Sequence, residues 1–227
     1  MSKIKFNITI WKERLKNGAD INKPDEKGWT ALDYAIRADS IEGVEFCINK
    51  GADVNATDNE TPLFWAHWCD ADVIKAFIDA GADVNAKNNL GETAFTRIIQ
   101  YGATSDVFNI LIKAGADINA IDNNGRTPLF YVARYSKTAK TVEALLKLGT
   151  DINTRDNNGT TPLFMAAYGN KNPEVIKALL EYGADVNIRD DSGKTALEYT
   201  YKNYRVRKIL LHYKEQINRV DKQKILK

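Results

Sequence analysis

Histidine and cysteine are scarce in this chain, whose 227 residues include only two of each. His67 and His212 lie far apart in the sequence, and no Cys/His spacing fits a zinc site. Two cysteines are too few for the disulfide framework of a small secreted domain. The sequence has no pattern that pairs a catalytic nucleophile with a general base, and it has no Gly-rich phosphate-binding motif. The sequence therefore predicts no enzyme activity, no metal site and no cofactor.

Long apolar stretches are absent as well. No run of about 18 apolar residues exists, so the sequence predicts no membrane-spanning helix. The N-terminus, Met-Ser-Lys-Ile-Lys-Phe-Asn, lacks the apolar centre of a secretory signal. Hydrophobic residues still make up 44% of the chain, an ordinary share for a folded protein. We expect a soluble cytoplasmic protein, or one that is delivered into a host cell.

Two short phrases recur through the chain at matched intervals. The phrase Gly-Ala-Asp-(Val/Ile)-Asn, with Thr in place of Ala at position 150, begins at Gly18, Gly51, Gly81, Gly115, Gly149 and Gly183. The phrase Thr-(Pro/Ala)-(Leu/Phe) lies between these and begins at Thr30, Thr61, Thr93, Thr127, Thr161 and Thr195. The Gly phrases begin 33, 30, 34, 34 and 34 residues apart. Self-similarity at this period indicates a repeat architecture.

In period and phrases the sequence resembles the ankyrin repeat over essentially its whole length. The resemblance implies an all-α repeat solenoid in which helix-turn-helix units stack and β-hairpin loops project. We expect a single domain of about six repeats, including atypical caps at its ends. The predicted parts are an N-terminal half-repeat cap at 1–24, repeats at 25–57, 58–87, 88–121, 122–155 and 156–189, and a capping repeat with a basic tail at 190–227.

The residues of the two phrases are predicted to serve the scaffold. Each Thr is an N-cap candidate, because its hydroxyl can accept a backbone N–H that the helix start leaves unpaired. Each Gly follows the second helix of its unit, where a left-handed conformation is needed. The strings Asp-Asn-Asn-Gly at 122–125 and 156–159 are typical of turns at hairpin tips.

Three departures from the ankyrin pattern lead to further expectations. The family usually has His after Thr-Pro-Leu, where it ties neighbouring loops together; this chain has Asp33, Phe64, Thr96, Phe130, Phe164 and Glu198. Apolar packing should therefore replace part of a polar network, which leaves the tethering of the loops open. The 30-residue unit should have a blunted hairpin at 58–60. At the C-terminal end, 195–203 should form a first helix and a long basic second helix should follow from Arg205.

Ankyrin-repeat proteins usually bind partners on a concave face made by hairpin tips and the exposed ends of first helices. Carried over by position, this resemblance implies a set of partner-binding residues here: Trp29, Arg37, Trp68, Tyr101, Arg126, Arg134, Tyr135, Tyr168 and Lys194. Trp, Tyr and Arg are the residue types that dominate binding hot spots. The alternative is that these aromatic residues only cover gaps between repeats.

The leading hypothesis is a monomeric, non-catalytic module that binds another protein or a peptide on this face, with no small-molecule substrate. A second hypothesis starts from residues 202–227, which contain nine Lys and Arg residues but only two acidic residues, Glu215 and Asp221. The rest of the chain has a net charge of −5. This helix could bind nucleic acid or an anionic membrane. A third hypothesis is a regulatory or targeting fragment of a larger protein.

Overall fold

The computed structural model describes residues 5–56, 59–201 and 203–225. The chain forms two compact units, residues 1–117 and 118–227. Within the described residues the regular structure is helical, and extended residues pair only at an isolated antiparallel bridge between Lys87 and Thr93. The predicted all-α repeat fold is confirmed, with hairpin loops that are held by turns rather than by strands.

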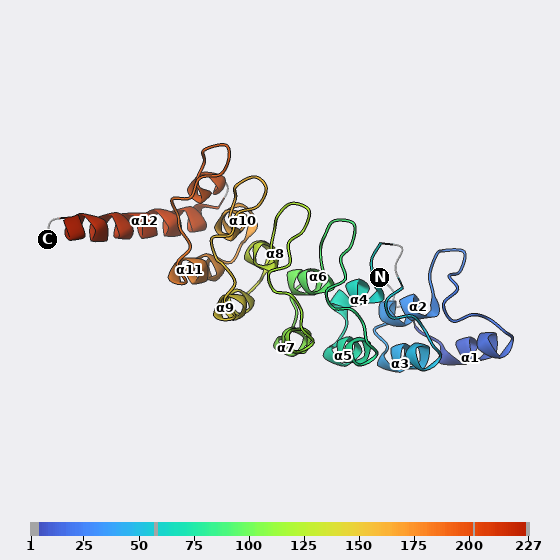
Figure 1. Cartoon of the computed structure of the whole chain (residues 1–227). Helices are drawn as coiled ribbons and strands as arrows, with labels where there is room; N and C mark the ends of the chain where they lie inside the picture. Colours follow the sequence, from blue (N-terminus) through green and yellow to red (C-terminus); the bar gives the residue numbers. More distant parts are fainter. Residues whose placement is uncertain (1–4, 57–58, 202, 226–227) are drawn as a thin grey trace. The chain divides into compact units, whose positions relative to one another are not determined.

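The first unit starts with one helix, α1 (Ile8–Lys16), which has no helical partner before it in the described residues. Helix pairs follow, each made of a first and a second helix joined by a short turn (Figure 1). The pairs are α2 (Ala31–Arg37) with α3 (Ile41–Asn49), α4 (Pro62–Trp65) and the 3-10 helix η1 (Ala66–Trp68) with α5 (Ala71–Asp79), and α6 (Ala94–Gln100) with α7 (Ser105–Lys113).

The second unit repeats this arrangement: α8 (Pro128–Tyr135) with α9 (Lys140–Lys147), α10 (Pro162–Gly169) with α11 (Pro173–Glu181), and the 3-10 helix η2 (Ala196–Tyr199) with α12 (Tyr204–Ile225). The prediction of a first helix over 195–203 is wrong, because η2 is a single turn. The Thr200 hydroxyl donates to the Leu197 carbonyl at 2.7 Å and helps to close that turn. Asn203 then caps α12, since its side chain accepts from the Val206 N–H.

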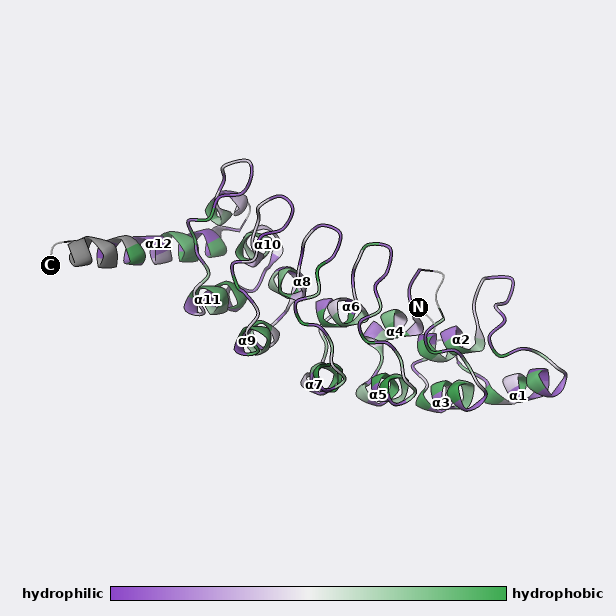
Figure 2. Ribbon diagram, in the orientation of Figure 1, coloured by the Kyte–Doolittle hydropathy of each residue, from purple (hydrophilic) through white to green (hydrophobic). Residues whose placement is uncertain are grey.

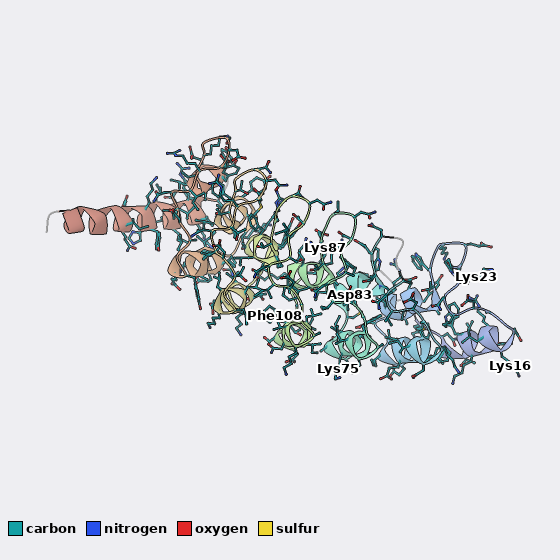
Figure 3. The ribbon with its side chains drawn as sticks, in the orientation of Figure 1. Lys16, Lys23, Lys75, Asp83, Lys87 and Phe108 are labelled. Carbon is teal, nitrogen blue, oxygen red and sulfur yellow. The ribbon has the colours of Figure 1, made fainter. Side chains whose placement is uncertain are left out.

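The core of each unit lies between its first and second helices. Figure 2 shows apolar residues on the helices and polar residues along much of the hairpin loops. Phe64, Phe130 and Phe164 are fully buried, which confirms that apolar packing occupies the position where the family usually has His. Phe108 of α7 (labelled in Figure 3) packs on Phe95 of α6, with 5.9 Å between ring centroids.

The Thr residues before the first helices divide into two groups. Thr30 and Thr93 accept a helical N–H as predicted, and Thr195 donates its hydroxyl to Glu198. The prediction is wrong for three others, whose buried hydroxyls have no partner: Thr61, Thr127 and Thr161. The difference follows the third helical residue, which is Asp, Thr or Glu in the first group and Phe in the second. In the second group the Phe backbone N–H donates to the Thr carbonyl oxygen at 2.9 to 3.0 Å instead of to the hydroxyl, and the Phe side chain offers that hydroxyl no partner.

Successive helix pairs are joined through the ends of their second helices. The Gly of each five-residue phrase has a positive φ, between 83° and 94°, which confirms its predicted role at the helix end. The side chain of Asn55 donates to the Gly81 carbonyl at 2.9 Å and accepts from the Asp83 N–H at 2.8 Å. Asn22, Asn85 and Asn153 make the same two contacts with the following repeat. In these four cases the Asn of the phrase ties its repeat to the next one.

The shortened repeat keeps the length of its first helix by changing helix type. Four α-helical residues (62–65) and three 3-10 residues (66–68) rise about 12 Å, as do the eight residues of α8. A 3-10 helix rises more per residue, so fewer residues cover the same distance. The tip of the preceding hairpin, predicted to be blunted, includes residues 57 and 58, which lie outside the described residues.

Candidate functional site

The hairpin-side face of each unit is the surface made by its hairpin loops and the C-terminal ends of its first helices. In each unit the hairpins project from the first helices on the side away from the second helices (Figure 1). The hairpins are held by an Asp or Asn at their start. For example, Oδ1 of Asp122 accepts from the backbone N–H groups of Asn124 and Arg126, both at 2.8 Å. The loops are therefore ordered platforms for the side chains they carry.

In the first unit, Trp29 and Arg37 form a stacked cluster with Trp65. The Arg37 guanidinium carbon lies 3.9 Å from the centre of the Trp29 ring and 5.4 Å from that of Trp65. Trp29 is half-buried and packs edge-on against Tyr34. Arg37 is thus held between two indole rings, which fixes a positive charge on this surface.

A second aromatic group lies further along the same unit. The ring of His67 stacks on Tyr101 at 4.3 Å and meets the edge of Trp68 at 4.2 Å. His67 Nδ1 is 2.9 Å from the Phe64 carbonyl oxygen and donates to it, and burial lowers the pKa of this imidazole. The Trp68 indole N–H donates to the Ile36 carbonyl. Neutral His67 is therefore the centre of an aromatic cluster.

Trp68 and Tyr101 are 43% and 59% exposed. With His67 they line a cavity of about 530 Å³ between the ends of η1 and α6 and the starts of α5 and α7. Exposed carboxylates surround it: Asp70, Asp72 and Asp106. This part of the hairpin-side face is aromatic and acidic.

An ion cluster not anticipated from the sequence ties two hairpins of the first unit together. Arg97 Nη2 lies 2.6 Å from Glu60 Oε1 and 3.1 Å from Glu92 Oε2. Asn88 donates to both carboxylates. The sequence feature that could have predicted this cluster is Arg97, which occupies the position where three other repeats have Tyr34, Tyr131 and Tyr199. The loop tethering left open by the missing His is supplied here by charge.

In the second unit, Arg134 lies between two tyrosines. Its guanidinium carbon is 5.0 Å from the Tyr135 ring centre and 5.3 Å from that of Tyr168. These tyrosines are 45% and 59% exposed. Arg134 also packs against Gly169, where an added Cβ would come within 3.1 Å of its Cγ. A neighbouring cavity of about 540 Å³ has the exposed cations Lys137 and Lys171 in its wall.

Arg126 and Lys194 differ in whether their side chains are free to contact a partner. Arg126 Nε lies 3.1 Å from Oδ2 of Asp156, whose side chain is fully buried, so this Arg links two hairpins. Lys194 is exposed, and its backbone N–H donates to Asp190. The two most exposed aromatic residues were missed by the sequence reasoning, Tyr201 at 72% and Tyr204 at 78%. They lie six and nine positions after Thr195, on either side of the offsets of seven and eight residues that give the predicted aromatic positions.

The two units differ in charge. Residues 1–117 carry 13 Lys and Arg against 18 Asp and Glu, a net charge of −5, whereas residues 118–227 carry 19 against 12, a net charge of +7. The charged side chains around the two cavities have the same signs as their units: Asp70, Asp72 and Asp106 in the first, and Lys137 and Lys171 in the second. The exposed aromatic surface of the first unit is therefore acidic, and that of the second unit is basic.

Comparison with known proteins agrees with this architecture. The family described as "Ankyrin repeats (3 copies)" matches residues 3–88, 63–156 and 130–221, and hence most of the chain. The chain belongs to the ankyrin-repeat family. Ankyrin repeats are generally non-enzymatic modules that mediate interactions between proteins, which agrees with a surface of ordered loops and exposed aromatic side chains.

Two relatives show how far the similarity extends. The crystal structure of the human ASB11 ankyrin repeat domain superposes with a TM-score of 0.79, at 24% identity, over 91% of this chain and 92% of that one. The palmitoyltransferase AKR1 of Candida albicans (strain SC5314) is 35% identical over 78 residues, which are 33% of this chain. The chain matches only 10% of the length of this curated relative. The first comparison concerns the fold alone.

Other kinds of site were sought in the part of the chain that the structure describes. No three His, Cys, Asp or Glu side chains gather there as metal ligands would. None of its helices combines the length and apolar character needed to cross a bilayer. Cys47 and Cys69 are free cysteines. The hairpin-side face, with its exposed aromatic residues, is thus the main candidate for function.

Proposed function

We propose that this ankyrin-repeat chain is a non-catalytic, monomeric protein-binding module whose hairpin-side face takes a protein or peptide. One observation carries the proposal: exposed aromatic side chains lie at the ends of four first helices, namely Trp68, Tyr101, Tyr135 and Tyr168. Burial of large aromatic side chains is a main source of affinity at interfaces, and these four remain 43% to 59% exposed in the folded chain.

Charged groups beside the aromatic residues support selectivity. Arg37 and Arg134 are each held by two aromatic rings, so little conformational freedom is lost when they bind a carboxylate. Arg126 already pairs with Asp156, and we assign it a role in holding the hairpins rather than in selecting a partner. We expect Arg134, Lys137 and Lys171 to favour acidic segments and the Asp-rich cavity near Trp68 to favour basic ones.

The test is a quantitative pull-down with the full chain from lysates of the source organism and of a host. Wild type is compared with the triple variant Trp68→Ala/Tyr101→Ala/Tyr135→Ala. The matched control is Ile10→Ala/Leu148→Ala/Tyr182→Ala, which removes apolar side chains of similar exposure from α1 and from the ends of second helices. Circular dichroism establishes that all three proteins fold.

We expect a protein that wild type and the control retain and the triple variant loses. Once purified, that protein should bind the triple variant at least about tenfold more weakly than wild type. A loss of this size is expected when one hot-spot residue is removed. Equal retention by all three proteins would contradict the proposal and leave the aromatic residues a packing role.

A further inference from the structure

A groove lies between α11 and α12, and of its lining residues only Pro173 also lines the cavity beside Tyr135. Its volume is about 630 Å³, and its lining is mainly apolar. The second helix α11 contributes Pro173, Lys177, Leu180 and Glu181, at the spacing of one helix face. The helix α12 contributes Arg205, Lys208, Ile209, His212, Tyr213 and Gln216, again at the spacing of one face. The groove thus runs along both helices.

The floor of the groove is built by packing between the two helices. The Tyr213 hydroxyl donates to the Leu180 carbonyl at 2.9 Å, which brings the ring across α11. Ile209 and Tyr213 remain half-buried, so part of their apolar surface meets solvent. The helix α12 has 22 residues and α11 has nine, so α12 continues beyond its neighbour. The lining residues Arg205 to Gln216 span about 16 Å, or three turns of a helix.

The rim of the groove is basic. Lys177, Arg205 and Lys208 are exposed along it, and Glu181 is the acidic residue in the lining. The Lys177 ammonium also contacts Glu174 at 2.9 Å, an exposed pair within one helix that is worth little and can be given up. The second unit as a whole has a net charge of +7. An apolar floor between cationic rims is complementary to a helix with one apolar face and acidic flanks.

We propose that the α11–α12 groove binds an acidic amphipathic helix of a partner protein, about three turns long. The apolar face of that helix lies on half-buried Ile209 and Tyr213, beside nearly buried Leu180, and its Glu or Asp side chains reach Lys177, Arg205 and Lys208. The α12 helix of a second copy does not fit, because its described charged residues are mostly cationic and would face a cationic rim.

The experiment uses the full chain and two fluorescent peptides of about 16 residues that form amphipathic helices. They share Leu positions on the apolar face; one has Glu on its flanks and the other has Lys. Fluorescence anisotropy measures their dissociation constants for wild type, for Lys177→Glu/Lys208→Glu, and for Ile209→Ser. The matched control is Lys140→Glu/Lys147→Glu, which makes the same charge change at exposed positions of α9.

We expect wild type and the α9 control to bind the Glu peptide and to prefer it over the Lys peptide. The Lys177→Glu/Lys208→Glu variant should bind the Glu peptide about tenfold or more weakly and reverse the preference. Ile209→Ser should weaken binding of the Glu peptide without changing the preference. Equal effects of the groove and α9 variants would overturn the proposal, because they would mean attraction to net charge alone.

A short DNA duplex serves as competitor. If it binds through Lys177 and Lys208 and displaces the peptide with no effect of Ile209→Ser, the groove is a phosphate-binding surface and the proposal fails. The residues changed here lie outside the hairpin-side face, so the outcome is independent of the pull-down with the Trp68, Tyr101 and Tyr135 variant.

Discussion

The Tyr34 hydroxyl donates a hydrogen bond to the Asp25 carboxylate, with 2.6 Å between Oη and Oδ2. The same contact recurs between residues nine apart in two other repeats, Tyr131 with Asp122 and Tyr199 with Asp190. In each, the Asp also accepts backbone N–H groups of its own hairpin. A phenol on the first helix thereby fixes the base of the loop that precedes it.

Replacement of Tyr34 by Phe should raise the pKa of Asp25. The Tyr34 hydrogen bond is the main cause that lowers this pKa below its usual value. A carboxylate with a lowered pKa in the folded state adds stability above its unfolded pKa of about 4, and that stability is lost as the pH falls through the folded value. The variant should therefore show a weaker loss of stability on acidification. NMR titration of the Asp25 carboxyl carbon and urea unfolding between neutral and acidic pH would measure both effects; an unchanged titration would contradict the prediction.

Replacement of Thr127 by Val should leave stability unchanged or raise it. The Thr127 hydroxyl is buried without a partner, so Val removes a desolvated polar group of nearly the same shape. Thr93→Val is the matched comparison, because the Thr93 hydroxyl accepts the Thr96 N–H and contacts the Thr96 hydroxyl. That variant should lose about 1 kcal/mol of unfolding free energy. Urea denaturation of both proteins distinguishes them, and an equal loss would count against the division of the Thr residues into two groups.

Replacement of Gly43 by Ala should destabilise the first unit although Ala favours helices. A Cβ at position 43 of α3 would lie 2.7 Å from Phe6 and 3.1 Å from the Cβ of buried Ala35. Overpacking of this kind costs about 1 to 3 kcal/mol, which exceeds the gain of about 1 kcal/mol in helix propensity. Thermal unfolding should show a lower midpoint than wild type. A higher midpoint would mean that Phe6 moves aside and that α2 and α3 tolerate the methyl group.

Neither cysteine should react with a thiol reagent in the folded protein at neutral pH. Burial raises the pKa of the Cys47 thiol to about 12. Burial, together with the charge of Asp39, also raises the pKa of Cys69, whose thiol donates to the Ile36 carbonyl. The thiolate, the reactive form, is therefore scarce at both positions. Colorimetric titration should detect two thiols in denaturant and slow reaction without it; a fast phase in native protein would contradict this.

The fold was largely predictable because its scaffold residues act within one repeat or on the next. Gly81 adopts a positive φ and Phe130 is buried for reasons visible in a single repeat. The state of the candidate site residues was less predictable, because it depends on neighbours from other repeats. Arg126 pairs with Asp156, thirty residues away, and Arg37 is held by Trp65 of the next repeat as well as by Trp29. The loss of the Thr127 cap depends on backbone geometry within its own repeat, because the Phe130 N–H donates to the Thr127 carbonyl oxygen rather than to its hydroxyl.

The change of helix type at 62–68 affects how the repeats should be aligned. Trp68 ends η1 seven positions after Thr61, whereas Tyr135 ends α8 eight positions after Thr127. The two aromatic residues occupy the same end of their respective first helices, yet a position-by-position alignment from the Thr would match Trp68 with Arg134. Surface features of such repeats are therefore better compared by axial distance along each first helix than by residue count, and a side chain that looks shifted in a sequence alignment can lie at the same helix end.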